Sequence, residues 1–137
     1  MRLLLVCGGR WYAHPVTSTG NTNIHYSEQH RLVWRNLTRL LQDVGFDGVV
    51  EGAAQGADTA AHEWAVDHGL IAIRMPPKRG QSPLHRNIDM WRAWRQHIYN
   101  VAAFPGGTGT EDMVRIVQSE SPARIWRLPQ GEPSLGL

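Results

Sequence analysis

Cysteine, lysine and long apolar runs are almost absent from this sequence. Cys7 is the only cysteine, so neither a disulfide within the chain nor a cysteine-rich zinc site can form. No stretch approaches the roughly 18 consecutive apolar residues that cross a bilayer. The apolar start of the chain breaks at Gly8 and Gly9, too early for a secretory signal. We therefore expect a cytoplasmic protein with no membrane partner, in which Cys7 is a small buried residue and not a nucleophile.

The basic residues are nearly all arginine and are not clustered. Lys78 is the only lysine, and the other 13 of the 14 basic residues are arginines. Against 12 acidic residues they leave a net charge of only +2. Arginine suits bidentate recognition of phosphate or carboxylate, but a nucleic-acid interface needs a basic patch. The dispersed charge therefore disfavours nucleic acid as a partner.

Three common site motifs are also missing. The seven histidines show neither an HExxH pattern nor a tight pairing with carboxylates, so we expect no metal site. No GxGxxG follows the first apolar run, and Lys78 lies far from any loop of the GxxxxGK(S/T) type. These absences argue against an NAD-type Rossmann site and a P-loop ATPase, and we expect no cofactor.

Short apolar runs alternate along the chain with helical stretches of ten or more residues. We predict strands at Leu3–Val6, Gly48–Glu51, Leu70–Arg74, Ile98–Phe104 and Ala123–Leu128, and helices at Glu28–Val44, Ala57–His68, Leu84–Gln96 and Thr110–Ser119. This alternation indicates right-handed crossovers and a parallel sheet. The prediction is a single Rossmann-like α/β domain over residues 1–128, doubly wound around a mainly parallel five-stranded sheet. Residues 129–137 are expected to be a disordered tail.

The stretch Arg10–Ser27 lacks apolar periodicity and contains Pro15 and Gly20. Long loops in compact domains are usually functional or mobile, so we interpret this one as a lid. Trp11 lies where it can stack on a base. Ser27 is expected to cap the helix that follows.

Three of the five predicted strands run into glycine-containing turns. These turns are Gly8-Gly9-Arg10, Gly52 to Gly56 and Gly106 to Thr110. All three fall at the carboxyl edge of the sheet, where open parallel sheets bind their ligands. Glycine allows close approach of a ligand to the backbone, and the helix after each turn offers unpaired N–H groups to an anion. A single turn of this kind is explained by tight strand-to-helix geometry, but three together favour a phosphate-bearing ligand.

These turns carry a resemblance to a known family. The segments GGRWY (Gly8–Tyr12), GAAQGAD (Gly52–Asp58), RNIDM (Arg86–Met90) and FPGGTGTEDMV (Phe104–Val114) resemble the YspA-like branch of the SLOG superfamily. That superfamily also contains the LOG phosphoribohydrolases and the DNA-processing protein DprA. The resemblance extends over about residues 1–128 and implies a Rossmann-like fold that binds nucleotides or nucleotide-derived signals.

The LOG enzymes release a free base and ribose 5-phosphate from nucleoside monophosphates, using a PGGxGTxxE motif and an arginine in RKxxM. Arg86 of RNIDM matches that arginine, and residues 105–110 match the first part of the other motif. Met113 stands where the motif has glutamate. In an enzyme of this type the catalytic residues would therefore be Arg86 with Asp112 or Glu111. Both acids also suit the first turn of a helix for its dipole alone.

We therefore predict a site that binds a nucleotide or nucleotide-derived ligand, as a sensor or sequestering module. The residues assigned to it are Gly8, Gly9, Arg10, Gly52, Ala53, Gly56, Asp58, Arg86, Asn87, Pro105, Gly106, Gly107, Thr108, Gly109 and Thr110. Asp58 either accepts hydrogen bonds from ribose hydroxyls or only caps its helix. The alternatives are a LOG-type phosphoribohydrolase and, third, single-stranded DNA binding as in DprA. Trp91 and Trp94 form an aromatic stripe that packs in the core or forms a homodimer face.

Overall fold

The computed structural model describes the backbone of residues 1–10 and 24–129, and the side chains of residues 1–10 and 28–129. Three predictions lie outside these residues. They are the lid formed by the Arg10–Ser27 loop, the stacking of Trp11 on a base, and the disordered tail beyond residue 129.

The sheet is a five-stranded, all-parallel sheet in the order β3-β2-β1-β4-β5. Its strands are β1 (Leu3–Cys7), β2 (Gly48–Glu51), β3 (Ile71–Arg74), β4 (Ile98–Ala103) and β5 (Arg124–Arg127). The three central strands are built mainly from short apolar runs and are buried on both faces, whereas the edge strands β3 and β5 are partly exposed. The predicted Rossmann-like α/β fold is confirmed, and the sheet is wholly parallel.

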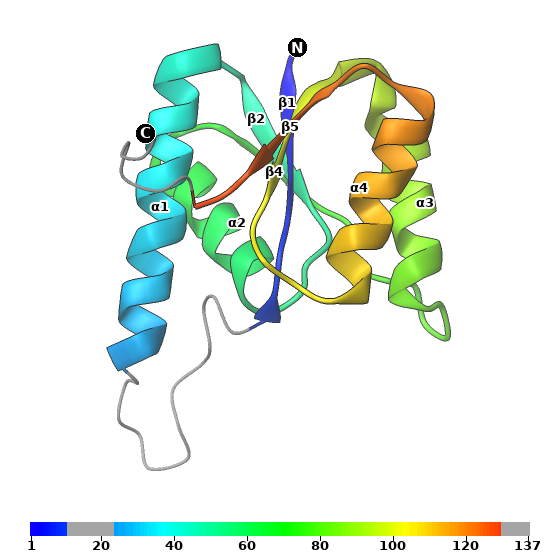
Figure 1. Ribbon diagram of the computed structural model, residues 1–137, viewed down its shortest axis with the longest axis horizontal. Helices are drawn as coiled ribbons and strands as arrows, with labels where there is room; N and C mark the ends of the chain where they lie inside the picture. The colour runs from blue at the N-terminus through cyan, green and yellow to red at the C-terminus, as the bar shows by residue number, and fades with distance from the viewer. Residues whose placement is uncertain (11–23, 130–137) are drawn as a thin grey trace.

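Four helices flank this sheet on both faces. They are α1 (Ile24–Val44), α2 (Ala57–Asp67), α3 (Pro83–Trp94) and α4 (Thr108–Glu120), with a short 3₁₀ turn η2 (Arg95–His97) before β4. Figure 1 shows α1 and α2 on one side of the sheet and α3 and α4 on the other. The chain therefore winds in both directions from β1, which is the doubly wound arrangement.

Two predicted helix starts are wrong by two to four residues. α1 begins at Ile24, so Ser27 lies inside the helix and does not cap it. In its first turn only Ile24 and Tyr26 are apolar or aromatic, and they are two residues apart, so no helical repeat predicts this start. α4 begins at Thr108, with Gly107 as its N-cap, because its first residues are glycine and threonine and not apolar positions.

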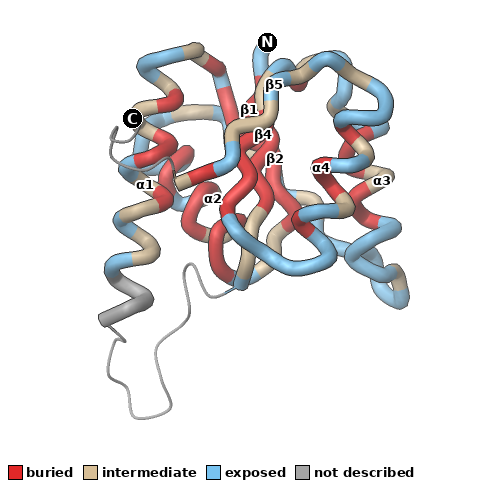
Figure 2. The backbone as a smooth tube through the Cα atoms, in the orientation of Figure 1, coloured by how far each residue is buried: buried red, intermediate tan, exposed pale blue. Residues whose placement is uncertain are grey.

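Alternating residues of β1 form the centres of two apolar cores. Leu4 and Val6 pack with α1 and α2 around Trp64, whereas Leu3, Leu5 and Cys7 pack on the side of α3 and α4. Figure 2 shows the central strands as the most continuously buried part of the chain. This pattern follows from the pleat, which directs successive side chains to opposite faces.

The aromatic stripe on α3 packs inside the domain. Trp91 is 2% exposed, and its indole N–H donates a hydrogen bond to Glu120 of α4 at 3.0 Å. Trp94 packs partly buried against the same core, and its indole N–H donates to the Met75 sulfur at 3.1 Å. The core role of Trp91 is therefore confirmed, and this buried residue cannot form a dimer face. Whether the chain forms a homodimer stays a prediction.

Backbone hydrogen bonds join the glycine turns at the carboxyl edge of the sheet. Gly9 N–H donates to the Pro105 carbonyl at 2.8 Å, and Ala57 N–H donates to the Gly9 carbonyl at 3.2 Å. The first turn is therefore fixed to both others. It lies beside β4, and in the strand order the chain passes from β1 to β2 and β3 on one side and from β4 to β5 on the other (Figure 1). This topological switch point is where an open parallel sheet binds a ligand.

Candidate functional site

A cavity of about 630 Å³ opens at the switch point between β1 and β4. Its volume lies within the range of pockets that hold small molecules. The residues that line it are Val6, Cys7, Gly8, Gly9, Arg10, Gly52, Ala53, Ala54, Gln55, Asp58, Pro77, Pro83, Arg86, Asn87, Met90, Gly107, Gly109 and Thr110. All three predicted turns thus contribute to one cavity wall.

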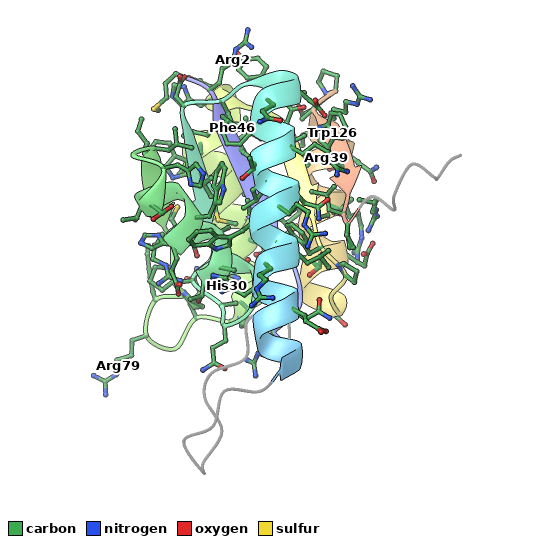
Figure 3. The ribbon with its side chains drawn as sticks, turned by 90° about the vertical axis from the view of Figure 1, so that its left-hand side faces the viewer. Arg2, His30, Arg39, Phe46, Arg79 and Trp126 are labelled. Atoms are coloured by element: carbon green, nitrogen blue, oxygen red, sulfur yellow. The ribbon has the colours of Figure 1, made fainter. Side chains whose placement is uncertain are left out.

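Some of the predicted residues lie elsewhere. Gly56, Pro105, Gly106 and Thr108 support the turns without lining the cavity. Pro77, Pro83 and Met90, from α3 and the loop before it, also line the cavity, although the sequence analysis did not assign them to the site. Figure 3 shows that Arg79 of the same loop extends away from the protein.

The glycines of the site fall into two classes. A Cβ on Gly8 would lie 2.7 Å from the Cβ of Ala57, and one on Gly106 would lie 2.9 Å from the Gly9 nitrogen. The protein's own packing therefore requires these two glycines. At Gly107 and Gly109 no atom of the described residues lies within 4 Å of the position that a Cβ would take. Their backbone instead faces the open cavity.

The N-terminus of α4 provides the part of the cavity best suited to an anion. Gly107 is the N-cap and offers no side-chain hydrogen bond to the helix. The first N–H groups of a helix have no partner within the helix, and its dipole places positive charge there. Arg10, which is exposed and lines the same cavity, adds a formal positive charge. Together they can bind a phosphate.

Arg86 is committed mainly to the protein's own backbone. Its guanidinium donates hydrogen bonds to the Gly52 carbonyl, to the Met75 carbonyl at 3.3 Å, and to the Asn87 side-chain oxygen at 3.1 Å. A Cβ on Gly52 would collide with this guanidinium, so the glycine is required there. Arg86 thus lines the cavity as predicted and also holds the loops after β2 and β3 together.

Replacing Arg86 with methionine is expected to lower the free energy of unfolding by about 2–3 kcal/mol, because the buried Gly52 carbonyl loses its donor. Urea unfolding measures this directly. Arg92→Met is the matched control, since Arg92 is exposed on the same helix, and we expect it to change the stability by less than about 0.5 kcal/mol. Equal effects of the two substitutions would contradict the structural role of Arg86.

The two acids considered as catalytic residues do not line the cavity. Glu111 is exposed and paired with Arg127, whose guanidinium nitrogens lie 2.7 and 3.1 Å from its carboxylate oxygens. This pairing holds the pKa of Glu111 below its usual value. Asp112 accepts a hydrogen bond from Asn87 at 3.2 Å. Met113, at the motif position of the glutamate, is fully buried in the core.

Asp58 is the only carboxylate among the described residues that line the cavity. It lies in the first turn of α2 and is only 5% exposed. Its Oδ2 accepts hydrogen bonds from the N–H groups of Gly52 at 3.1 Å and Ala54 at 3.2 Å. Its Oδ1 is buried and has no hydrogen-bond partner among the described residues. Burial, and then the nearby charge of Glu51, raise the pKa of Asp58 to about 7.

Glu51, which the sequence analysis did not assign to the site, shapes the loop beside the cavity. At the end of β2 it is fully buried, and it accepts hydrogen bonds from Arg74 at 2.9 and 3.3 Å and from the Ala53 N–H at 2.7 Å. His62 lies 3.4 Å from the same carboxylate. Ala53 itself has a φ of 62°, a left-handed conformation that costs on the order of 1–3 kcal/mol in a residue other than glycine. The loop beside the cavity is thus held in a strained shape by the buried Glu51 carboxylate, which is paired with the exposed Arg74.

The thiol of Cys7 lies at the floor of the cavity but is not activated. Burial, followed by the charge of Asp58, raises its pKa well above the usual range, which disfavours the reactive thiolate. Among the described residues, no three histidine, cysteine or acidic side chains lie together as metal ligands would. No described helix is long and apolar enough to cross a bilayer.

Comparison with known proteins gives one structural relative and one family. The solved structure of TM1055 has a similar fold, with a TM-score of 0.57 and 17% sequence identity over 84% of this chain and 67% of that chain. At this identity the likeness extends to the fold alone. No curated protein matches the chain.

The family match covers residues 3–81, which include the turns at Gly8 and Gly52, the buried Glu51 and Asp58. The α4 loop lies beyond this match. Because the matched residues make up more than half of the sequence, the chain belongs to the YspA, cpYpsA-related SLOG family.

Proposed function

We propose that the protein binds a nucleotide or nucleotide-derived ligand in the cavity at the carboxyl edge of its sheet. Membership of the SLOG family suggests nucleotide-related binding. The observation that carries the proposal is the open backbone of Gly107 and Gly109 at the N-terminus of α4. No packing among the described residues explains these two glycines, whereas contact of a phosphate with the helix N-terminus does.

The electrostatic asymmetry of the cavity gives the ligand one orientation. The helix N-terminus and Arg10 favour a phosphate on the α4 side, whereas the Asp58 carboxylate disfavours it on the α2 side. Pro77, Pro83 and Met90 add an apolar wall of the kind that packs against a planar base. A phosphate at α4 and a sugar towards Asp58 satisfy these constraints together.

Binding without turnover is favoured over the LOG-type reaction. That reaction was assigned to Asp112 or Glu111, and neither side chain lines the cavity. Single-stranded DNA binding has no observation in its favour, because the described residues do not gather arginines beside exposed aromatic rings at this edge of the sheet. We therefore propose ligand binding alone.

A thermal-shift screen tests the proposal with nucleoside mono-, di- and triphosphates, cyclic dinucleotides, NAD and ADP-ribose. A ligand at 100 times its Kd adds about 2.7 kcal/mol to the stability, which raises Tm by on the order of 10 °C in a domain of this size. Inorganic phosphate at the same concentration is the control for anion binding alone. We expect at least one nucleotide to exceed the phosphate control, and a screen in which none does would refute the proposal.

A further inference from the structure

Resting on the proposed function, the geometry points to a finer selectivity: Asp58 Oδ1 binds a sugar hydroxyl, so that the cavity selects ribonucleotides over their deoxy counterparts. The unpaired Oδ1 of Asp58 carries this inference. Asp58 is 5% exposed, lines the cavity, and presents an oxygen without a hydrogen-bond partner among the described residues.

The other oxygen of the same carboxylate fixes its position. Oδ2 is held by the N–H groups of Gly52 and Ala54, so the side chain cannot turn towards another partner without breaking both bonds. Gly52 is in turn bonded through its carbonyl to Arg86. The orientation of Oδ1 is therefore set by the protein before any ligand binds, as specific recognition requires.

The charges around Asp58 decide which ligand group fits there. Glu51 lies behind the loop, and its carboxylate raises the pKa of Asp58, whereas the Arg86 guanidinium and the two loop N–H groups lower it. The Cys7 thiol adds no positive charge. A phosphate oxygen at this end of the cavity would lie beside the Asp58 carboxylate and is disfavoured there.

A hydroxyl fits both protonation states of Asp58. It donates to the ionised carboxylate and accepts from the neutral acid, whereas an amino group can only donate and a carbonyl can only accept. A ligand that lacks the hydroxyl leaves Oδ1 buried and unpaired, at a cost of about 1–3 kcal/mol. The expected preference for the hydroxyl-bearing ligand is therefore about 10- to 100-fold in Kd.

Isothermal titration calorimetry on the full chain tests the inference with AMP, GMP, CMP and UMP and with the 2′-deoxy and 3′-deoxy form of each. We expect the ribonucleotide that binds best to lose about 10- to 100-fold in affinity when one of its two hydroxyls is removed. Equal affinities of all three forms would overturn the inference and leave the proposed function standing. No binding by any of the four ribonucleotides would overturn the inference, whereas the proposed function is refuted only by a thermal-shift screen in which no nucleotide exceeds the phosphate control.

Two variants assign the selectivity to Asp58. Asp58→Ala is expected to bring the affinity ratio of ribo to deoxy ligand close to one. Asp58→Asn, which keeps an oxygen for the two loop N–H groups, covers the case in which the alanine variant does not fold, and is expected to reduce the ratio several-fold. Asp67→Asn makes the same charge change at the exposed C-terminal end of α2 and is expected to leave the ratio unchanged. An unchanged ratio in the Asp58→Asn variant would overturn the assignment.

Discussion

Replacing Gly107 with aspartate is expected to weaken nucleotide binding by more than 100-fold without destabilising the protein. The new carboxylate would lie at the helix N-terminus that is proposed to bind the phosphate. Two unit charges about 5 Å apart repel by roughly 3 kcal/mol at an effective dielectric constant of 20. The same substitution places a preferred N-cap residue where the helix has no side-chain cap, which raises its stability by a few tenths of a kcal/mol.

Because affinity is expected to fall while stability rises slightly, the two measurements together distinguish loss of the ligand site from damage to the fold. Thermal unfolding is measured with and without the ligand that the screen identifies. Gln118→Asp is the matched control, because Gln118 is exposed in the last turns of the same helix and the charge change is the same. Binding that survives in the Gly107 variant would place the phosphate elsewhere, and binding lost equally in both variants would indicate a general effect of charge.

The second large effect concerns pH. The pKa of Asp58 is raised in the folded protein from 3.8 to about 7, so the folded state binds more protons than the unfolded state between these values. The contribution of Asp58 to the free energy of unfolding is therefore fully present below about pH 4. It is lost as the pH rises towards 7, by on the order of 3–4 kcal/mol. The raised pKa of Glu51 acts in the same direction, whereas the lowered pKa of Glu111 acts in the opposite one.

Asp58→Asn removes this titration and isolates its contribution. We expect the variant to be more stable than the parent protein at pH 8 and nearly equal to it at pH 4, with a flatter profile between. Urea unfolding at several pH values measures both curves. Asp67→Asn serves again as the control and should follow the parent curve. A parent curve that rises from pH 4 to 7, or an Asp58→Asn curve that coincides with it, would contradict the assignment.

The sheet could be predicted from the sequence because its signals are local. Leu3 to Val6 is apolar on both faces and ends at glycine, and this pattern depends on no distant residue. The start of α1 could not be predicted in the same way, since its first turn shows no apolar repeat. For Trp91 the sequence leaves two alternatives, packing in the core and a homodimer face. Periodicity identifies the apolar face of a helix but does not show whether the same domain or a second copy packs against it.

The candidate site could be predicted in part. Glycine turns at one sheet edge locate the ligand side, because strand topology brings them together. The burial of Glu51 and the unpaired oxygen of Asp58 depend on contacts with Arg74 and the Gly52 loop, which no spacing in the sequence reveals. The same limit explains Arg86, whose charge suggested a ligand contact although its donors are largely taken up by carbonyl groups of the protein.

The backbone hydrogen bonds that join Gly9 to Pro105 and to Ala57 have a consequence for how this site can diverge. These bonds involve main-chain atoms only, so they do not depend on which side chains face the cavity. Arg10 and Gln55 line the cavity with exposed side chains and can be exchanged while these main-chain bonds persist. Relatives of this chain can therefore acquire new ligands through changes in a few side chains, with the backbone fold of the site unchanged.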